Sequence, residues 1–213
     1  ARLTGEGIDL ADLVGGGNGH GTGRKGSGLV LETGESTSEK LALHRNVKPN
    51  RLTSDRISLP AAGSSRFVNG VFLPNAGTLR ITEDIRISGL PATSGIGWDA
   101  VRNGLLNAQA HARAGGTDFA GPGHSVLGLH ANAGVVFDLT AIRRAGGLGD
   151  LRLTATVGFG AKEAAAQTKA DFAIYLDAER VLHRPGLLKT DSIAVDLAVP
   201  PTARFLTLMA TDG

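Results

Sequence analysis

The alternation of apolar and polar residues is clearest in the second half of the chain. Residues 151–159 (LRLTATVGF) alternate over nine positions, which is the period of a half-buried antiparallel strand. Further strand-like runs lie at residues 135–139, 172–176, 180–182, 192–199 and 204–210. A polar connection at 177–179 separates two of these runs as a hairpin turn does, and Pro200-Pro201 breaks the chain between the last two.

The first half carries fewer strand signals. Residues 67–73 (FVNGVFL) hold an Asn-Gly turn signal between apolar pairs, and residues 79–87 (LRITEDIRI) alternate at both ends, so that one face is buried. Short apolar runs at 8–14 and 29–31 flank residues 15–28, where eight of fourteen positions are glycine. Such a composition is too flexible for regular structure and predicts loops.

Two stretches have some helical character. Residues 98–114 (WDAVRNGLLNAQAHARA) place Val101, Leu105 and Ala108 near helical spacing, although Gly104 weakens the pattern. Residues 161–169 (AKEAAAQTK) favour a helix of one or two turns or a mobile connection. Because no regular series of crossover helices lies between the strands, a parallel β-α-β fold is excluded.

The predicted fold class is all-β: an antiparallel β-sandwich or jelly roll, with a loop-rich N-terminal region and at most one or two short helices. Residues 1–66 form the glycine-rich region with short strands, and residues 67–213 form the sandwich. The N-terminus has neither an initiator Met nor an apolar run typical of a signal peptide, so we expect a processed or excised piece of a larger protein.

Composition narrows the function classes. The chain has 31 glycines, 41% hydrophobic residues, 20% charged residues and a net charge of +2, which excludes a disordered chain and a nucleic-acid-binding face. No window is apolar enough for a membrane-spanning helix, so we expect no membrane insertion. The absence of cysteine excludes disulfides and thiolate metal sites.

Catalytic motifs do not stand out. Residues 21–26 (GTGRKG) match a phosphate-binding fingerprint but lack the helix that must follow it. The histidines have no zinc-enzyme spacing, and no nucleophile motif is present. We therefore expect no enzyme activity and no cofactor. A structural calcium ion is the one possible exception, since Asp138, Asp177 and Asp196 lie at strand ends.

A family resemblance begins near the middle of the chain. Residues 128–134 (GLHANAG) run directly into the strand at 135–139, and the segments 157–159 (VGF) and 170–181 (ADFAIYLDAERV) follow in order. Over about residues 117–213 this series resembles the NPCBM family, the novel putative carbohydrate-binding modules attached to secreted bacterial glycosidases and surface proteins. Ala178 departs from the glycine often found in that hairpin. The resemblance implies a glycan-binding β-sandwich outside the cytoplasm.

Three residues are candidates for ligand binding. Trp98, the only tryptophan, follows a flexible turn and either offers an apolar face to a sugar ring or fills the core. His130 and Asn132 lie in the turn that the resemblance places near a characteristic position. Aromatic residues make up only 4% of the chain, which favours an alternative: a structural building block for self-assembly or domain packing, whose edge strands have few lysines to guard them. The expected partners are therefore a glycan or neighbouring protein domains, with possible self-association, in an extracellular or cell-envelope location.

Overall fold

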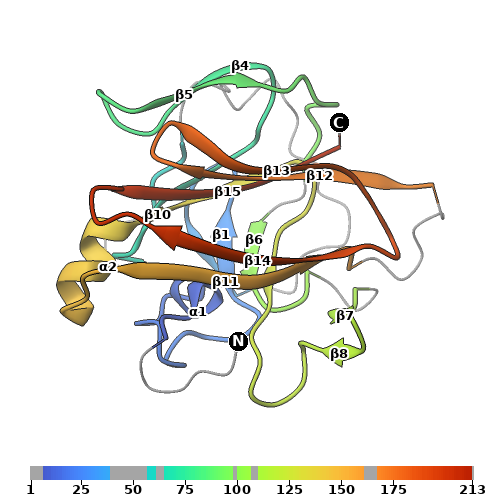
Figure 1. The fold of residues 1–213 in the computed structure, drawn as a ribbon, viewed down its shortest axis with the longest axis horizontal. Coiled ribbons are helices and arrows are strands. Elements are labelled where there is room, and N and C mark those ends of the chain that lie inside the picture. The colour runs from blue at the N-terminus through green and yellow to red at the C-terminus, as the bar shows by residue number, and fades with distance from the viewer. Residues whose placement is uncertain are drawn as a thin grey trace.

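The fold is built around one antiparallel sheet. The structure, a computed structural model, describes residues 7–38, 57–60, 65–97, 100–106, 110–160 and 167–212. Its central sheet has five strands in the order β13-β12-β15-β10-β3 (Figure 1). In that order the strands are β13 (Glu179–Leu188), β12 (Lys169–Leu176), β15 (Phe205–Thr211), β10 (Ala133–Asp138) and β3 (Val68–Phe72).

One face of the central sheet packs against two smaller sheets. The first is the antiparallel pair β11 (Leu151–Gly158) and β14 (Ser192–Val199). The second has the order β2-β1-β6-β9, with the short helix α1 beside it. Its elements are α1 (Leu10–Val14), β1 (Gly28–Val30), β2 (Ser36–Thr37), β6 (Ala100–Asn103) and β9 (Leu127–Gly128). Leu29, Val135 and Val195 contribute to one hydrophobic cluster that joins all three sheets.

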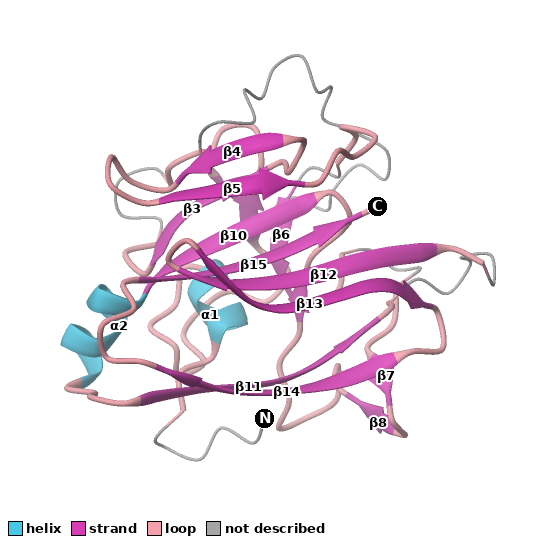
Figure 2. Ribbon diagram, turned by 45° about the horizontal axis from the view of Figure 1, so that its top comes forward, coloured by secondary structure: helices cyan, strands magenta, loops and turns pink. Residues whose placement is uncertain are grey.

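The other face of the central sheet is covered by the hairpin of β4 (Gly77–Arg80) and β5 (Arg86–Leu90) (Figure 2). Leu79 and Ile87 of the hairpin are fully buried, in a second cluster with Val136 and Met209 of the central sheet. Because both faces are covered, β15 is buried at every position. Burial on both faces replaces the usual alternation in this strand.

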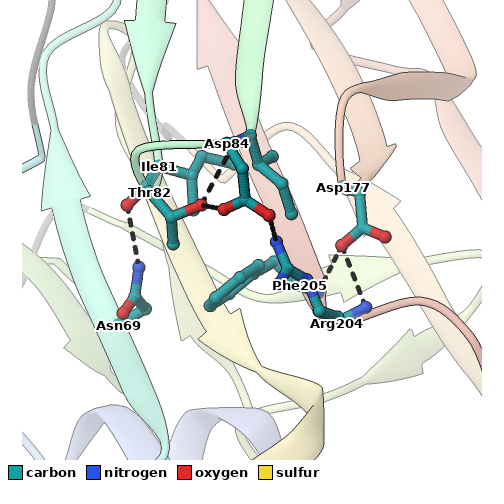
Figure 3. A network of polar contacts seen from close by, with 8 residues as sticks. Asn69, Ile81, Thr82, Asp84, Asp177, Arg204 and Phe205 are labelled. Atoms are coloured by element: carbon teal, nitrogen blue, oxygen red, sulfur yellow. Dashed lines mark hydrogen bonds and ion pairs between the residues drawn. The ribbon is translucent and has the colours of Figure 1, made fainter.

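A polar network fixes the hairpin to the sheet (Figure 3). The guanidinium of Arg204, just before β15, donates from Nη2 to Asp84 in the β4–β5 turn at 2.5 Å, and Thr82 donates to the same carboxylate at 2.7 Å. Asp177, in the β12–β13 turn, accepts the backbone N–H groups of Arg204 and Phe205 at 2.9 and 2.8 Å. These bonds connect three turns that are distant in sequence.

The remaining elements lie at the two ends of the sandwich. Helix α2 (Leu139–Gly146) starts where Asp138 accepts the N–H of Ala141, and it ends at Gly147, whose φ of 60° suits a glycine cap. The pair β7 (Arg113–Ala114) and β8 (Thr117–Asp118) lies at the opposite end of β11 (Figure 2). Neither helix among the described residues has the length and apolar character needed to cross a membrane.

The predicted fold class is confirmed, since antiparallel sheets dominate and the described residues contain two short helices. The division at residue 66 stays a prediction, although Leu13 and Leu29 share a core cluster with Val135. Residues 161–169, predicted as a short helix or a mobile connection, lie largely outside the described residues, and residue 169 begins β12.

Two local predictions are wrong. Residues 100–103, expected within a helix, form β6, because Val101 pairs with Leu29 of β1 and all four β6 residues are buried. The Asn-Gly turn expected at 69–70 is instead the middle of β3. Gly70 is required there for close packing, since a Cβ would lie 2.9 Å from the side chain of Ile57. Long-range pairing overrides the local signal at both places.

Candidate functional site

A compact set of polar groups lies where β10 begins and β15 ends. Asn132 is completely buried at 0% exposure, and its amide nitrogen donates to Ser94 Oγ at 3.2 Å and to the Ile96 carbonyl at 3.0 Å. Its side-chain oxygen accepts the N–H of Asp212 at 2.8 Å. We call Ser94, Ile96, His130, Asn132 and Asp212 the Asn132 cluster. Asn132 thus joins the 91–97 loop to both strands.

The carboxylate of Asp212 is the charged group of the cluster. It accepts hydrogen bonds from the backbone N–H of Ser94 at 3.1 Å and from the Ser94 hydroxyl, and it faces solvent. Partial burial acts to raise the pKa of Asp212, but hydrogen bonding to Ser94 and Asn132 outweighs it and lowers the pKa below its usual value. The carboxylate is therefore ionised at neutral pH and acts as a hydrogen-bond acceptor.

His130 is half-buried beside this carboxylate. Desolvation lowers the pKa of its imidazole below the usual 6.5, against the opposing effects of the Ala131 carbonyl and the charge of Asp212. Its Nδ1 lies against that carbonyl of Ala131. At neutral pH the ring is therefore uncharged, with one nitrogen able to donate and the other able to accept.

Apolar surface adjoins these polar groups. Ile96, whose carbonyl binds Asn132, is 44% exposed, and only Leu59 is a more exposed large hydrophobic residue in the described part of the chain. The Ser94 hydroxyl is saturated by protein groups, since it donates to Asp212 and accepts from Asn132 and from the Ile96 N–H. An ionised carboxylate and a neutral imidazole next to apolar surface can bind a molecule that carries hydroxyl groups on an apolar frame. The cluster is thus suited to recognition of a polyol.

The structure brings together two of the three predicted ligand-binding residues. His130 and Asn132 both belong to the cluster, and Trp98 lies outside the described residues, two positions after Ile96. The amide of Asn132 is engaged by protein groups, so it positions Asp212 and Ser94 and has no surface for a ligand. The ligand-binding role predicted for Asn132 is thus an indirect one, and direct ligand binding by Trp98 and His130 stays a prediction.

Sequence reasoning missed Ser94 and Asp212. Asp212 is 80 residues from Asn132 along the chain, and no local motif connects them. The only signal available was position, because Asp212 follows the last predicted strand and Ser94 lies in a Thr-Ser-Gly loop segment.

A second polar pair lies at the same end of the central sheet. Asp171 of β12 is opposite Thr211 of β15 in the strand register, one residue before Asp212. Its carboxylate accepts the N–H of Gly186 at 2.7 Å and lies 3.6 Å from Nε2 of His183. Both side chains are partly exposed, so they extend the polar surface of this end of the sheet.

The glycine-rich loop is held by a carboxylate of its own chain. Asp12 of α1, only 2% exposed, accepts the backbone N–H groups of Gly19 and Gly23 at 2.7 and 2.6 Å. Gly23 belongs to the 21–26 fingerprint, so its N–H points to Asp12, whereas a phosphate site needs it directed at the ligand. This loop is an internal structural element.

The three carboxylates considered for calcium are engaged at separate places. Asp138 caps α2, Asp177 binds the N–H groups that precede and begin β15, and Asp196 binds Arg152. They do not converge on a common site. Across the ranges that the structure describes, no group of three or more His, Asp or Glu side chains could hold a metal ion. Structural calcium stays a prediction without an assigned site.

Comparison with known proteins gives a partial likeness. No protein-family model matches the chain, and no curated protein does. Among solved structures, the CBM51 from Clostridium perfringens GH95, in complex with methyl-galactose, is 20% identical, with a TM-score of 0.43. The matched region covers 55% of this chain and 78% of that one. The M60 catalytic domain with the CBM51-1 and CBM51-2 domains of Clostridium perfringens ZmpB is 23% identical, with a TM-score of 0.41. That match covers 55% of this chain and 12% of the other.

Proposed function

We propose that the chain is a non-catalytic carbohydrate-binding-type module of a larger secreted or cell-surface bacterial protein. The observation that carries this proposal is the Asn132 cluster, in which an ionised carboxylate and a neutral imidazole adjoin exposed apolar surface. Carbohydrates need such a combination, because their rings carry both hydroxyl groups and an apolar C–H face. The resemblance of residues 117–213 to carbohydrate-binding modules supports the same function.

Each group of the cluster has a separate part in this proposal. The Asp212 carboxylate accepts hydrogen bonds from sugar hydroxyls with the lone pairs that Ser94 leaves free. The uncharged ring of His130 donates from Nδ1 to the Ala131 carbonyl, so its Nε2 accepts a hydrogen bond from a sugar hydroxyl. Asn132 holds Asp212 and Ser94 in register without touching the sugar. Ile96 and Trp98 pack against the C–H face of the ring.

A glycan array followed by titration calorimetry tests the proposal. We expect the protein to bind at least one class of plant, algal, bacterial or host glycan, and Asp212→Ala and His130→Ala to weaken that binding by about tenfold or more. Asp150→Ala is the matched control, because Asp150 is an exposed carboxylate four residues after α2. Figure 1 shows α2 at the opposite end of the central sheet from the C-terminus. We expect this variant to bind as the unmodified protein does.

Trp98 provides a second readout. It is the only tryptophan, so a glycan that packs against it changes the intrinsic fluorescence of the protein, and Trp98→Phe removes the signal. The proposal would be contradicted if the protein bound no glycan on the array, or if Asp212→Ala bound as tightly as the unmodified protein. If the unmodified protein binds a glycan without any change in fluorescence, Trp98 alone is removed from the site.

A second candidate function is a structural β-sandwich that mediates self-assembly or domain packing in an extracellular or envelope assembly. The observation that favours it is the outer edge of β14, which lacks the features that usually keep edge strands apart. The two functions are separable by experiment, since one concerns the Asn132 cluster and the other concerns a strand of the opposite sheet.

A further inference from the structure

Strand β14 has an open edge. In the part of the chain that the structure describes, it pairs with β11 alone, in an unbroken register from Ser192 to Val199. Within the described ranges, no backbone group pairs with the N–H and C=O groups on its other side. Its eight residues include no proline, no lysine, no arginine and no bulge. A regular, exposed strand edge of this kind favours pairing with another strand.

Both edge strands of the central sheet have features that hinder pairing with a further strand, and β14 lacks these features. Outer strand β13 contains Arg180, Arg184 and Pro185, and its register with β12 shifts twice. Outer strand β3 is capped by Ser58, which exchanges two backbone hydrogen bonds with Val71 at 2.7 and 3.0 Å. Compared with the two edges of the central sheet, the β14 edge therefore has fewer obstacles to pairing with another strand.

We propose that β14 pairs antiparallel with β14 of a second copy of this chain. Two two-stranded sheets then become one continuous four-stranded sheet across a two-fold axis. Because strand side chains alternate between faces, the register must place inward residues opposite inward residues. A register centred on Val195 does so, and it sets Ile193 opposite Leu197 of the second copy.

The sequence of β14 is self-complementary in this register. Ile193 and Leu197 are only half-buried in the single chain, and they meet on the inner face of the joined sheet. On the outer face, Ala194 is opposite Asp196 of the second copy, and Ser192 is opposite Ala198. No pair combines two charged or two bulky polar residues, so the strand can meet a copy of itself without repulsion.

Asp196 is the one charged residue of the strand, and its charge is already balanced. Arg152 of β11 donates to its carboxylate from Nη2 at 2.8 Å and also from Nε. This pair lies on the outer face, beside the site that Ala194 of the second copy occupies. The identity of residue 194 therefore decides whether the contact is neutral, repulsive or attractive.

Sedimentation equilibrium from micromolar to millimolar protein tests the inference. We expect a reversible dimer. Ala194→Glu places a carboxylate opposite Asp196 twice, once on each side of the axis, and weakens the dimer by about tenfold. Ala194→Lys places an ammonium group at the same two points and preserves or tightens the dimer.

Thr156 supplies the matched control. It is an exposed residue of β11 and the register partner of Ala194, so it lies on the same face but one strand away from the proposed axis. Thr156→Glu and Thr156→Lys should leave dimerisation unchanged. Circular dichroism establishes that all four variants are folded as the unmodified protein is.

The possible results separate the hypotheses. A β14 dimer gives the second candidate function a defined contact, and it is independent of glycan binding. A monomer at every concentration would overturn both the β14 dimer and self-assembly. A dimer that responds equally to Ala194→Glu and Ala194→Lys, or to neither, would overturn the β14 contact and leave self-assembly through another surface.

Discussion

The side-chain oxygen of Asn132 accepts the backbone N–H of Asp212 at 2.8 Å, although the two residues are 80 positions apart in the sequence. Through the same amide, Asn132 donates to Ser94 and to the carbonyl of Ile96. One fully buried side chain at the start of β10 therefore satisfies polar groups at the end of β15 and in a loop. Buried polar networks of this kind are costly to break, because each partner that is left alone remains desolvated.

Replacement of Asn132 should accordingly destabilise the fold. We expect Asn132→Ala to lower the free energy of unfolding by about 2–3 kcal/mol, because it removes three side-chain hydrogen bonds and leaves a small cavity. Asn69→Ala is the control, since Asn69 is half-buried and makes a single weak contact of 3.5 Å with the Ile81 carbonyl. Urea unfolding of both variants measures the difference. Equal losses would contradict the central position of Asn132.

The stability of the protein should depend on the ionisation of Asp212. Its pKa in the folded protein lies below the ordinary value of 3.8, so the carboxylate stabilises the fold above that value and loses this effect as the pH falls through the folded pKa. Asp212→Asn keeps the shape but removes the charge. We expect it to be less stable than the unmodified protein at neutral pH, and the difference to shrink in acid. A constant difference across an acid unfolding series would contradict the low pKa.

The ionisation of His130 should make the stability of the protein depend on pH in a range above that of Asp212. Burial lowers its pKa in the folded protein, so the unfolded chain takes up a proton near pH 6.5, before the folded protein does. Stability should therefore fall as the pH decreases from 6.5 towards the folded pKa, and level off below it. His130→Gln should remove this part of the pH dependence. Proton NMR titration of the ring gives the folded pKa directly, and a value at or above 6.5 would contradict the prediction.

Parts of this architecture could be read from the sequence, for physical reasons that are visible in individual strands. Strand β11 faces solvent on one side, so its alternation is intact and it was predicted almost to the residue. Helix α2 was not predicted, although Asp138 as its cap and Gly147 as its end are ordinary helix signals. The strand at 100–103 depends on pairing with residues 28–30, which no local pattern reveals.

The candidate site was predictable only in part. The turn at 130–132 was recognisable through a family resemblance, whereas Ser94 and Asp212 reach Asn132 only after the sheet has formed. Hydrogen bonds between such distant segments follow from topology, so a sequence pattern cannot supply them. The burial of both faces of β15 has the same origin, because the covering hairpin β4–β5 lies far away in the chain.

Two groups in the network around Arg204 should differ sharply in their importance. Asp177 accepts two backbone N–H groups at the entry to β15, so Asp177→Ala should cost about 1–2 kcal/mol of unfolding free energy. The ion pair of Arg204 with Asp84 is exposed on both sides, so Asp84→Ala should have a smaller effect. The part of this effect due to the ion pair vanishes in high salt, and the part due to the hydrogen bond from Thr82 remains. Urea unfolding at two salt concentrations separates the two contributions. A larger loss for Asp84→Ala would show that the ion pair holds the hairpin.

Phe72 packs so closely against Gly134 that we expect position 134 to tolerate only glycine. The two residues are opposite each other on β3 and β10, and a Cβ at position 134 would overlap the aromatic ring. Gly134→Ala should therefore destabilise the protein by about 1–3 kcal/mol through overpacking. Phe72→Leu alone should also be destabilising, because it leaves a cavity in the core beneath the β4–β5 hairpin.

The double variant distinguishes overpacking from a general intolerance of change in β10. With leucine at position 72, the added methyl group at position 134 fills space that the ring vacated. The double variant should therefore lose about 1 kcal/mol less unfolding free energy than the sum of the two single variants. Gly149→Ala is the control, since a Cβ at position 149 would have no atom within 4 Å and the backbone there needs no glycine. Its stability should stay within about 0.5 kcal/mol of the unmodified protein. Strict additivity of Gly134→Ala and Phe72→Leu would mean that the ring does not determine the need for glycine at this position.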